Sequence, residues 1–246
     1  MDNPVAANVL GTMGAVLWSL QLLPQIWKNW RRHGSETLSP AFFLSWAIAG
    51  VPLGVYNITD NFNIALRVQP NMIIFLSLWT WSQCKYYGAK WSRKKVVLLA
   101  MAMALVFGGV EAGLVFALRV AREQGYKWPL TLMAILAALL LAGGVLRHYV
   151  DMIRTRSDAG ISLKFAILDA SGDVASLLSV IFQPSLNILG LVIYASELVI
   201  WLGLMAVVIY FRGPGRREER DVEEGNTALS GSQRVCQETS QSQPLN

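Results

Sequence analysis

Seven long apolar stretches constrain this chain more than any other feature of its sequence. A helix that crosses the hydrocarbon core of a bilayer needs about 20 mostly apolar residues, and seven stretches meet that requirement. They are Val5–Leu23, Pro40–Ile58, Val68–Tyr87, Val96–Val120, Pro129–Leu146, Ile161–Phe182 and Leu186–Phe211. Several begin at or near a proline, which helices tolerate at their first position. The sequence therefore predicts an all-α integral membrane protein with seven transmembrane helices.

The composition agrees with a membrane protein and argues against other classes. Of the 246 residues, 54% are hydrophobic and 15% are charged, whereas soluble domains have about 45–50% and about 25%. We therefore expect no soluble enzyme, nucleic-acid partner or secreted disulfide scaffold, despite a net charge of +5. Cys84 and Cys236 form no metal-binding motif, and neither H-E-x-x-H nor G-x-S-x-G is present. We expect no enzymatic activity, cofactor or metal.

The distribution of basic residues predicts the orientation in the membrane. With seven spans, 17 of the 21 lysines and arginines fall on one set of alternating loops and the tail, and four fall on the other set. Cytosolic loops carry the excess of Lys and Arg, so the N-terminus should be lumenal or extracellular and the C-terminus cytosolic. The polar tail, 212–246, has the composition of a disordered segment.

An internal repeat relates the two halves of the chain. An offset of 123 residues aligns Leu38-Ser39 with Ile161-Ser162, Phe42 with Phe165, and Ala49-Gly50 with Gly172-Asp173. An offset of 114 aligns Gln69-Pro70 with Gln183-Pro184. These matches predict two three-helix repeats, 1–87 and 129–211, joined by a linker helix in 88–128. The extra crossing returns the chain to its starting side, so the repeats run parallel, an arrangement that transporters use.

The segment LLPQIWKNWRRHGSETLSPAFFLSW resembles the PQ-loop family in Pro24-Gln25, Asn29, the basic stretch, the Leu-Ser pair, the Phe and Trp46. The second repeat resembles the same pattern in Gly160-Ile161-Ser162, Phe165 and Gly172-Asp173, but has Arg147-His148 where Pro-Gln would align. The first repeat has Ala49-Gly50 in place of a Gly-Asp pair. The family includes cystinosin, vacuolar and lysosomal cationic amino-acid exporters, SWEET sugar transporters and, more distantly, KDEL receptors. The resemblance covers all seven stretches and implies a 3+1+3 bundle with a central substrate pathway.

Acidic residues inside the apolar stretches are the first candidates for a functional site. Asp169 and Asp173 lie four residues apart on one predicted helix face, Glu197 lies in the last stretch, and Glu111 lies in the linker helix. An acid near the centre of a membrane helix costs about 2.5–3.5 kcal/mol on insertion scales and usually faces an interior or a water-filled cavity. Three roles remain open: proton coupling, binding of a cationic substrate, or a structural hydrogen bond.

Further candidates are a hinge and a pocket. Proline within a helix removes a backbone hydrogen bond, so Pro24 with Gln25, and Pro52, are predicted hinges, a role that the family resemblance supports for the Pro-Gln pair. The predicted substrate pocket consists of Trp46, Asn57, Trp79, Gln83 and Tyr194. Trp46 aligns with Asp169 at the offset of 123. The alternative for each aromatic residue is ordinary packing.

The expected function is transport of a small polar organic solute, with an amino acid as the leading candidate. Alternating access is the expected mechanism, and proton coupling remains open. The expected location is a vacuolar, lysosomal or other endomembrane. Two alternatives stay in view: a sorting receptor like the KDEL receptors, and a sugar facilitator like the SWEET proteins. The oligomeric state is left open.

Overall fold

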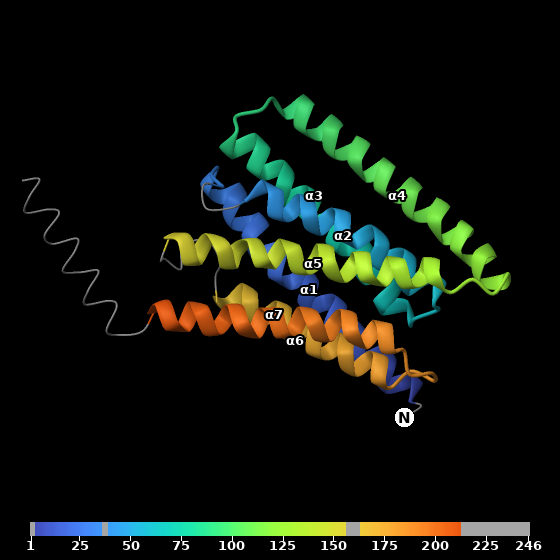
Figure 1. Ribbon diagram of the computed structural model, residues 1–246. Helices are drawn as coiled ribbons and strands as arrows, with labels where there is room; N and C mark the ends of the chain where they lie inside the picture. The colour runs from blue at the N-terminus through green and yellow to red at the C-terminus, as the bar shows by residue number, and fades with distance from the viewer. Residues whose placement is uncertain (1–2, 36–38, 156–162, 213–246) are drawn as a thin grey trace, which may run out of the picture. The chain divides into compact units, whose positions relative to one another are not determined.

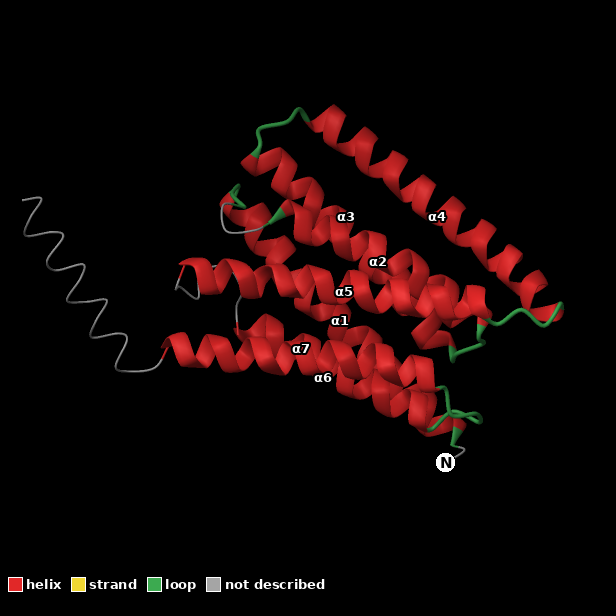
Figure 2. Cartoon of the chain, viewed as in Figure 1, coloured by secondary structure: helices red, strands yellow, loops and turns green. Residues whose placement is uncertain are grey.

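A computed structural model describes residues 3–35, 39–155 and 163–212 of the chain. Over these ranges it consists of helices and the loops between them, without strands (Figures 1 and 2). The elements are α1 (Pro4–Arg32), α2 (Pro40–Thr59), α3 (Ile64–Gln83), the π-helical turn η1 (Cys84–Gly88), α4 (Arg93–Glu123), α5 (Trp128–Thr155), α6 (Leu163–Ile181) and α7 (Ile188–Arg212). Residues 1–205 form one compact unit, and α7 continues into a second. Residues 213–246 of the predicted tail lie outside the described ranges.

Polar caps set where several helices begin. The Asn3 side chain accepts a hydrogen bond from the Ala6 amide at 3.1 Å, directly before Pro4. Asn63 does the same for α3, accepting from the Leu66 amide at 3.1 Å. An N-cap side chain of this kind satisfies an amide that has no partner within its helix. Because Asn63 caps α3, this helix begins at Ile64, and the predicted start at Val68 was wrong.

Helix α1 extends well beyond the apolar stretch that predicted it. The expected end was Leu23, yet the helix continues through Pro24 to Arg32, where His33 adopts a left-handed conformation with φ 49°. A left-handed residue is a common way to end a helix. Hydropathy marks the part of a helix that suits lipid, whereas the helix itself continues until a residue stops its hydrogen-bond ladder.

Small residues allow close packing between α1 and α6. Helix α1 packs against α6 and α3, and helix α2 packs against α3, α5 and α4. A Cβ atom on Gly172 would collide with the Trp18 indole, and one on Gly14 would collide with the Ser176 hydroxyl. Small residues at such crossings are typical of membrane helices. Helix α4, green in Figure 1, lies at the periphery and touches α2 and α3.

Five of the described helices are long and apolar enough to cross a membrane. They are α1, α2, α4, α5 over Trp128–Arg147, and α7 over Ile188–Tyr210. Helices α3 and α6 fall short because they carry the polar side chains of the interior. Gln69, Thr80 and Gln83 of α3 are buried, as are Asp169 and Asp173 of α6. The chain is thus an all-helical protein of membrane type, and α3 and α6 supply several of its buried polar groups.

Candidate functional site

Three buried carboxyl groups lie together in the helix bundle. Asp169 and Asp173 are one turn apart on α6 and are 1% and 0% exposed, and Glu197 on α7 is 2% exposed. Asp173 lies within electrostatic range of both Asp169 and Glu197. The structure therefore brings together all three acids that the sequence selected for proton or substrate binding.

Helix α1 supplies polar groups that face these acids. Trp18 and Gln21 are three residues apart, so they share one face of α1, and both are buried. The Trp18 indole Nε1 donates to the main-chain carbonyl oxygen of Asp169 at 3.3 Å. The Gln21 amide faces the Asp169 carboxyl, and the Trp18 indole also faces Asp173. The sequence did not single out Trp18 or Gln21, although an amide inside an apolar helix was a usable signal.

The acid cluster has unused hydrogen-bonding capacity. Among the residues that the structure describes, neither carboxylate oxygen of Asp169 or Asp173 has a hydrogen-bond partner, and the same holds for both amide atoms of Gln21. An ionised carboxylate buried without a partner is very costly. The cluster can therefore hold protons or receive a cationic group. Within the described ranges, no three acidic, histidine or cysteine side chains are placed to bind a metal ion.

Asn57 and Tyr194 adjoin the cluster on the side toward the end of α2. The Asn57 amide donates to the Tyr194 hydroxyl at 3.2 Å and to the Leu66 carbonyl oxygen at 2.7 Å. The Tyr194 ring lies 6.0 Å from that of Trp18. Two residues of the predicted pocket thus lie beside the acids, at the junction of α1, α2 and α7.

A polar contact between α3 and α6 extends the set of buried polar groups beyond Asp173. The Gln69 amide donates to the Ser176 hydroxyl at 3.2 Å, and both side chains are buried. The sequence-based prediction included Gln69 only as part of the repeated Gln-Pro pair. That repetition was the signal that could have identified Gln69 as a polar residue of the interior.

An aromatic layer lies one helical turn from the acids on their other side. The Trp46 ring lies 6.0 Å from that of Phe165 and 6.2 Å from that of Trp201, and the last two are 5.7 Å apart. Phe165 precedes Asp169 by one turn, and Trp201 follows Glu197 by one turn, facing it. Trp46, a predicted pocket residue, therefore belongs to a layer that packs over the acid cluster from the side where α2 and α6 begin.

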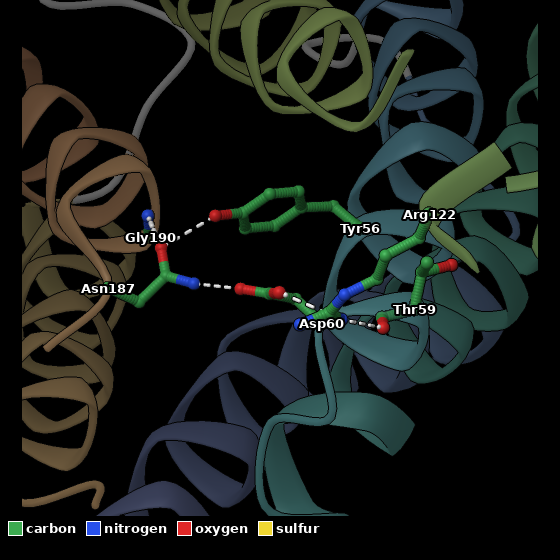
Figure 3. Close-up of polar contacts among 6 residues, drawn as sticks. All are labelled: Tyr56, Thr59, Asp60, Arg122, Asn187 and Gly190. Carbon is green, nitrogen blue, oxygen red and sulfur yellow. Dashed lines mark hydrogen bonds and ion pairs between the residues drawn. The ribbon is translucent and has the colours of Figure 1, made fainter. Parts of the chain in front are cut away.

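At the opposite end, a polar network ties α2, α4 and α7 together (Figure 3). The Tyr56 hydroxyl donates to Asn187 Oδ1 at 2.6 Å, and the Asn187 amide donates to the Asp60 carboxylate. Arg122 pairs with Asp60 at 3.1 Å and donates to the Thr59 carbonyl oxygen at 2.6 Å. We call Tyr56, Asp60, Arg122 and Asn187 the α2–α4–α7 latch.

A cavity of about 380 Å³ opens beside this latch, and Tyr56, Asp60, Arg122, Lys127 and Asn187 are among its lining residues. Burial raises the pKa of the Asp60 carboxyl, while the Arg122 guanidinium and the Asn187 amide oppose that rise. The cavity thus presents two bases and one acid at the same end as the chain's N-terminus.

The Pro-Gln pair lies in a third polar network. The Gln25 amide donates to Asn29 Oδ1 at 2.8 Å, and the Asn29 amide donates to Gln83 Oε1 at 3.1 Å. Gln83 in turn donates to the Ile26 carbonyl oxygen at 3.0 Å. Gln83 therefore joins α3 to the end of α1, and its place in the substrate pocket stays a prediction. Pro24 is exposed on an unbroken helix, Pro52 is buried in another, and both hinges stay predictions.

Two predicted residues lie apart from the acid cluster. Trp79 is 50% exposed and packs edge-on against Phe75 at 5.6 Å, on the outward face of α3. Glu111 of α4 is buried and accepts a hydrogen bond from the Asn71 amide at 3.0 Å. The structure does not bring Trp79 into a pocket with the other candidates, and Glu111 bridges α3 and α4.

Comparison with known proteins is consistent with these features. The PQ loop repeat matches residues 6–66. An uncharacterized protein of Schizosaccharomyces pombe is 36% identical over 209 residues, which cover 85% of this chain and 74% of the length of that protein. An uncharacterized membrane protein of Saccharomyces cerevisiae is 32% identical over 208 residues, covering 84% of this chain and 67% of its own. The chain belongs to the PQ-loop repeat family of membrane proteins.

Proposed function

We propose that this protein transports a small polar organic solute, an amino acid above all, by alternating access coupled to protons. The observation that carries the proposal is the cluster of Asp169, Asp173 and Glu197, buried together with unpaired oxygens in the aspartates. Ionisable residues at membrane depth mark proton relays and substrate pathways. The cluster could hold protons in one state and a cationic amino group in another.

Side-chain contacts support the parallel 3+1+3 arrangement, one of the repeat architectures that transporters use. Phe42 and Phe165, which the offset of 123 makes equivalent, lie 6.5 Å apart, as residues beside a two-fold axis would. Gln21 faces Asp169, and their equivalents at the same offset, Gly144 and Trp46, also pack together. The same relation makes the α1–α6 interface equivalent to the α2–α5 interface, and both interfaces are present. We infer that the repeats are related by an axis along the membrane normal.

A barrier at each end of the bundle interior supports gating on both sides of the membrane. The aromatic layer of Trp46, Phe165 and Trp201 covers the acids toward the start of α2 and α6. The α2–α4–α7 latch ties the other end. The Lys and Arg distribution favours a cytosolic aromatic layer and a lumenal latch. As part of the proposal, we place the protein in a vacuolar, lysosomal or other endomembrane. Opening one barrier at a time would expose the acids alternately.

Flux across reconstituted vesicles tests the proposal. Purified protein in vesicles with an acidic interior would be assayed with labelled cationic amino acids, neutral amino acids and sugars. We expect flux of an amino acid that rises with the pH gradient, and loss of that dependence in Asp173→Asn. Glu111→Gln is the matched control, because it neutralises a buried acid outside the cluster.

Other results would favour the alternatives. Sugar flux that does not depend on the pH gradient would indicate a facilitator of the SWEET type. A lumenal binding partner without flux of any solute would indicate a sorting receptor. Equal behaviour of Asp173→Asn and the unsubstituted protein, for every solute that moves, would refute proton coupling at this cluster.

A further inference from the structure

An apolar groove runs between α3 and α4 on the outside of the bundle. Its volume is about 470 Å³, and its lining includes Phe75, Leu78 and Trp79 of α3 and Ala100, Ala104 and Gly108 of α4. The three α4 residues are spaced four apart, so they form one small-residue face of that helix. A Cβ atom on Gly108 would meet no atom within 4 Å. Small side chains therefore form much of the α4 wall, beside Val97 and Met101, and leave the groove open.

The groove lies on the part of the surface that faces lipid, and this location restricts which molecules can occupy it. Helix α4 is among the helices apolar enough to cross a bilayer, and Phe75 and Trp79 are both at least half exposed. Water is a poor occupant of such a groove because it would leave apolar side chains hydrated. A lipid acyl chain matches its polarity and its position in the membrane.

One end of the groove carries a concentration of positive charge. Lys85, Lys90, Arg93, Lys94 and Lys95 lie between Ser82 of α3 and Val97 of α4, both of which line the groove. The sequence has no acidic residue between Asp60 and Glu111. Lys85 and Lys95 lie over the Trp91 ring, at 5.1 and 4.2 Å. In the described part of the chain, none of the five bases pairs with an acid.

Arg93 and Lys94 are the bases best placed for a ligand in the groove. They are exposed, and they precede the groove-lining Val97 by four and three residues on α4, which puts them on its groove-facing side. They also lie in the first turn of α4, where the helix end adds positive potential. Basic clusters next to membrane helices attract anionic lipid headgroups. The charge of this end thus complements a phosphate at the end of an acyl chain.

We propose that the α3–α4 groove binds an anionic phospholipid, with an acyl chain between Trp79 and Gly108 and the headgroup at Arg93 and Lys94. This site is separate from the acid cluster and does not depend on the proposed transport. It also gives Trp79 a role on the lipid-facing side of α3.

Quenching of Trp79 fluorescence by brominated lipid tests this site directly. Full-length protein would be reconstituted in phosphatidylcholine vesicles that contain, at equal mole fraction, either phosphatidylserine or phosphatidylcholine with brominated acyl chains. The Trp79 signal is the difference between the unsubstituted protein and Trp79→Phe. We expect stronger quenching by brominated phosphatidylserine, because it occupies the groove above its mole fraction.

Two pairs of variants separate the headgroup site from the groove. Arg93→Gln/Lys94→Gln should lower the preference for phosphatidylserine, by up to about fivefold per base, the factor for about 1 kcal/mol. Lys28→Gln/Arg31→Gln, at the end of α1, should leave the preference intact. Ala104→Leu/Gly108→Leu should abolish excess quenching by filling the groove, whereas Ala102→Leu/Gly109→Leu, beside it, should not.

The outcomes that overturn the proposal are equally specific. Equal quenching by the two brominated lipids would show that the groove has no anionic lipid site. A preference that survives Arg93→Gln/Lys94→Gln, or that falls as much in Lys28→Gln/Arg31→Gln, would show attraction to the whole basic face and no site. Excess quenching that survives Ala104→Leu/Gly108→Leu would place the lipid elsewhere.

Discussion

The Trp18 indole nitrogen lies 3.3 Å from the main-chain carbonyl oxygen of Asp169, across the α1–α6 interface. The indole can approach α6 this closely because residue 172, one turn away, is a glycine, whose Cβ would collide with the Trp18 ring. The approach holds the aromatic ring against the helix that carries two of the buried acids.

Gly172→Ala should therefore destabilise the protein by about 1–3 kcal/mol, the usual cost of overpacking. Gly109→Ala is the control, since no atom lies within 4 Å of its Cβ position. Thermal unfolding in detergent measures both. If the collision with Trp18 is the cause, Gly172→Ala should cost less in a Trp18→Leu background. An equal cost in both backgrounds would contradict this explanation.

Gln83 should contribute more to stability than its neighbour Ser82. Gln83 donates to the Ile26 carbonyl oxygen of α1 and accepts from the buried Asn29 amide, so Gln83→Leu removes both hydrogen bonds between α3 and α1 and leaves the buried Asn29 amide unsatisfied. We expect a loss of about 1–2 kcal/mol, read as a lower unfolding temperature. Ser82 bonds only to the Leu78 carbonyl oxygen of its own helix, and Ser82→Ala should change little. Similar losses would argue against a role for the α1–α3 link.

The Asp60–Arg122 pair should give a pH-dependent stability. Because burial raises the pKa of Asp60, the protonated carboxyl is favoured in the folded chain, and that stabilisation is lost as the pH rises through the folded pKa. Arg122→Gln removes the positive charge that opposes the rise. The ordinary pKa of a carboxyl group is about 4. The stability of the variant relative to the unsubstituted protein should therefore fall as the pH rises from about 4 toward neutral.

Unfolding temperatures across that range would measure the effect. Asp60→Asn/Arg122→Gln serves as the control, because its asparagine cannot titrate and its deficit should not vary with pH. A deficit in Arg122→Gln that is constant with pH would show that loss of the hydrogen bond to Thr59, and not the charge on Asp60, dominates.

Phe165→Ala should make the protein leaky to protons. Phe165 packs against both Trp46 and Trp201 in the layer that covers the acids, and we expect removal of its ring to open a path toward Asp169. A pH-sensitive dye inside vesicles should report faster dissipation of a pH gradient. Phe75→Ala removes a ring from the outward face of α3 and should not. Unchanged dissipation in Phe165→Ala would exclude this layer as the barrier.

Helix number and the acid cluster were predictable because both depend on local patterns. Apolar length located all seven helices, and the four-residue spacing of Asp169 and Asp173 placed them on one face. The position of Trp79 was harder to predict, because α3 has polar residues on several sides. Its buried positions, including Gln69, Thr80 and Gln83, recur with helical spacing, whereas Phe75 and Trp79 lie on the other side.

The contributions of Trp18 and Gln21 could not be read from α1 alone. Their importance comes from α6, which lies about 150 residues later in the sequence, since Trp18 and Asp169 are separated by 151 positions. The α2–α4–α7 latch has the same origin: Asp60, Arg122 and Asn187 come from three separate loops or helix ends. Tertiary packing, and no local signal, brings such groups together.

The charged residues of α6 have a consequence for how the protein is synthesised. A segment with two acids and Lys164 partitions poorly into lipid by itself. The side chains that face those acids, Trp18 and Gln21, belong to α1, which is synthesised before α6. Helix α1 must therefore stay available, with one face uncovered, while the next four helices are made. Membrane chaperones that shield α1 during this interval would decide how much of the newly made chain assembles correctly.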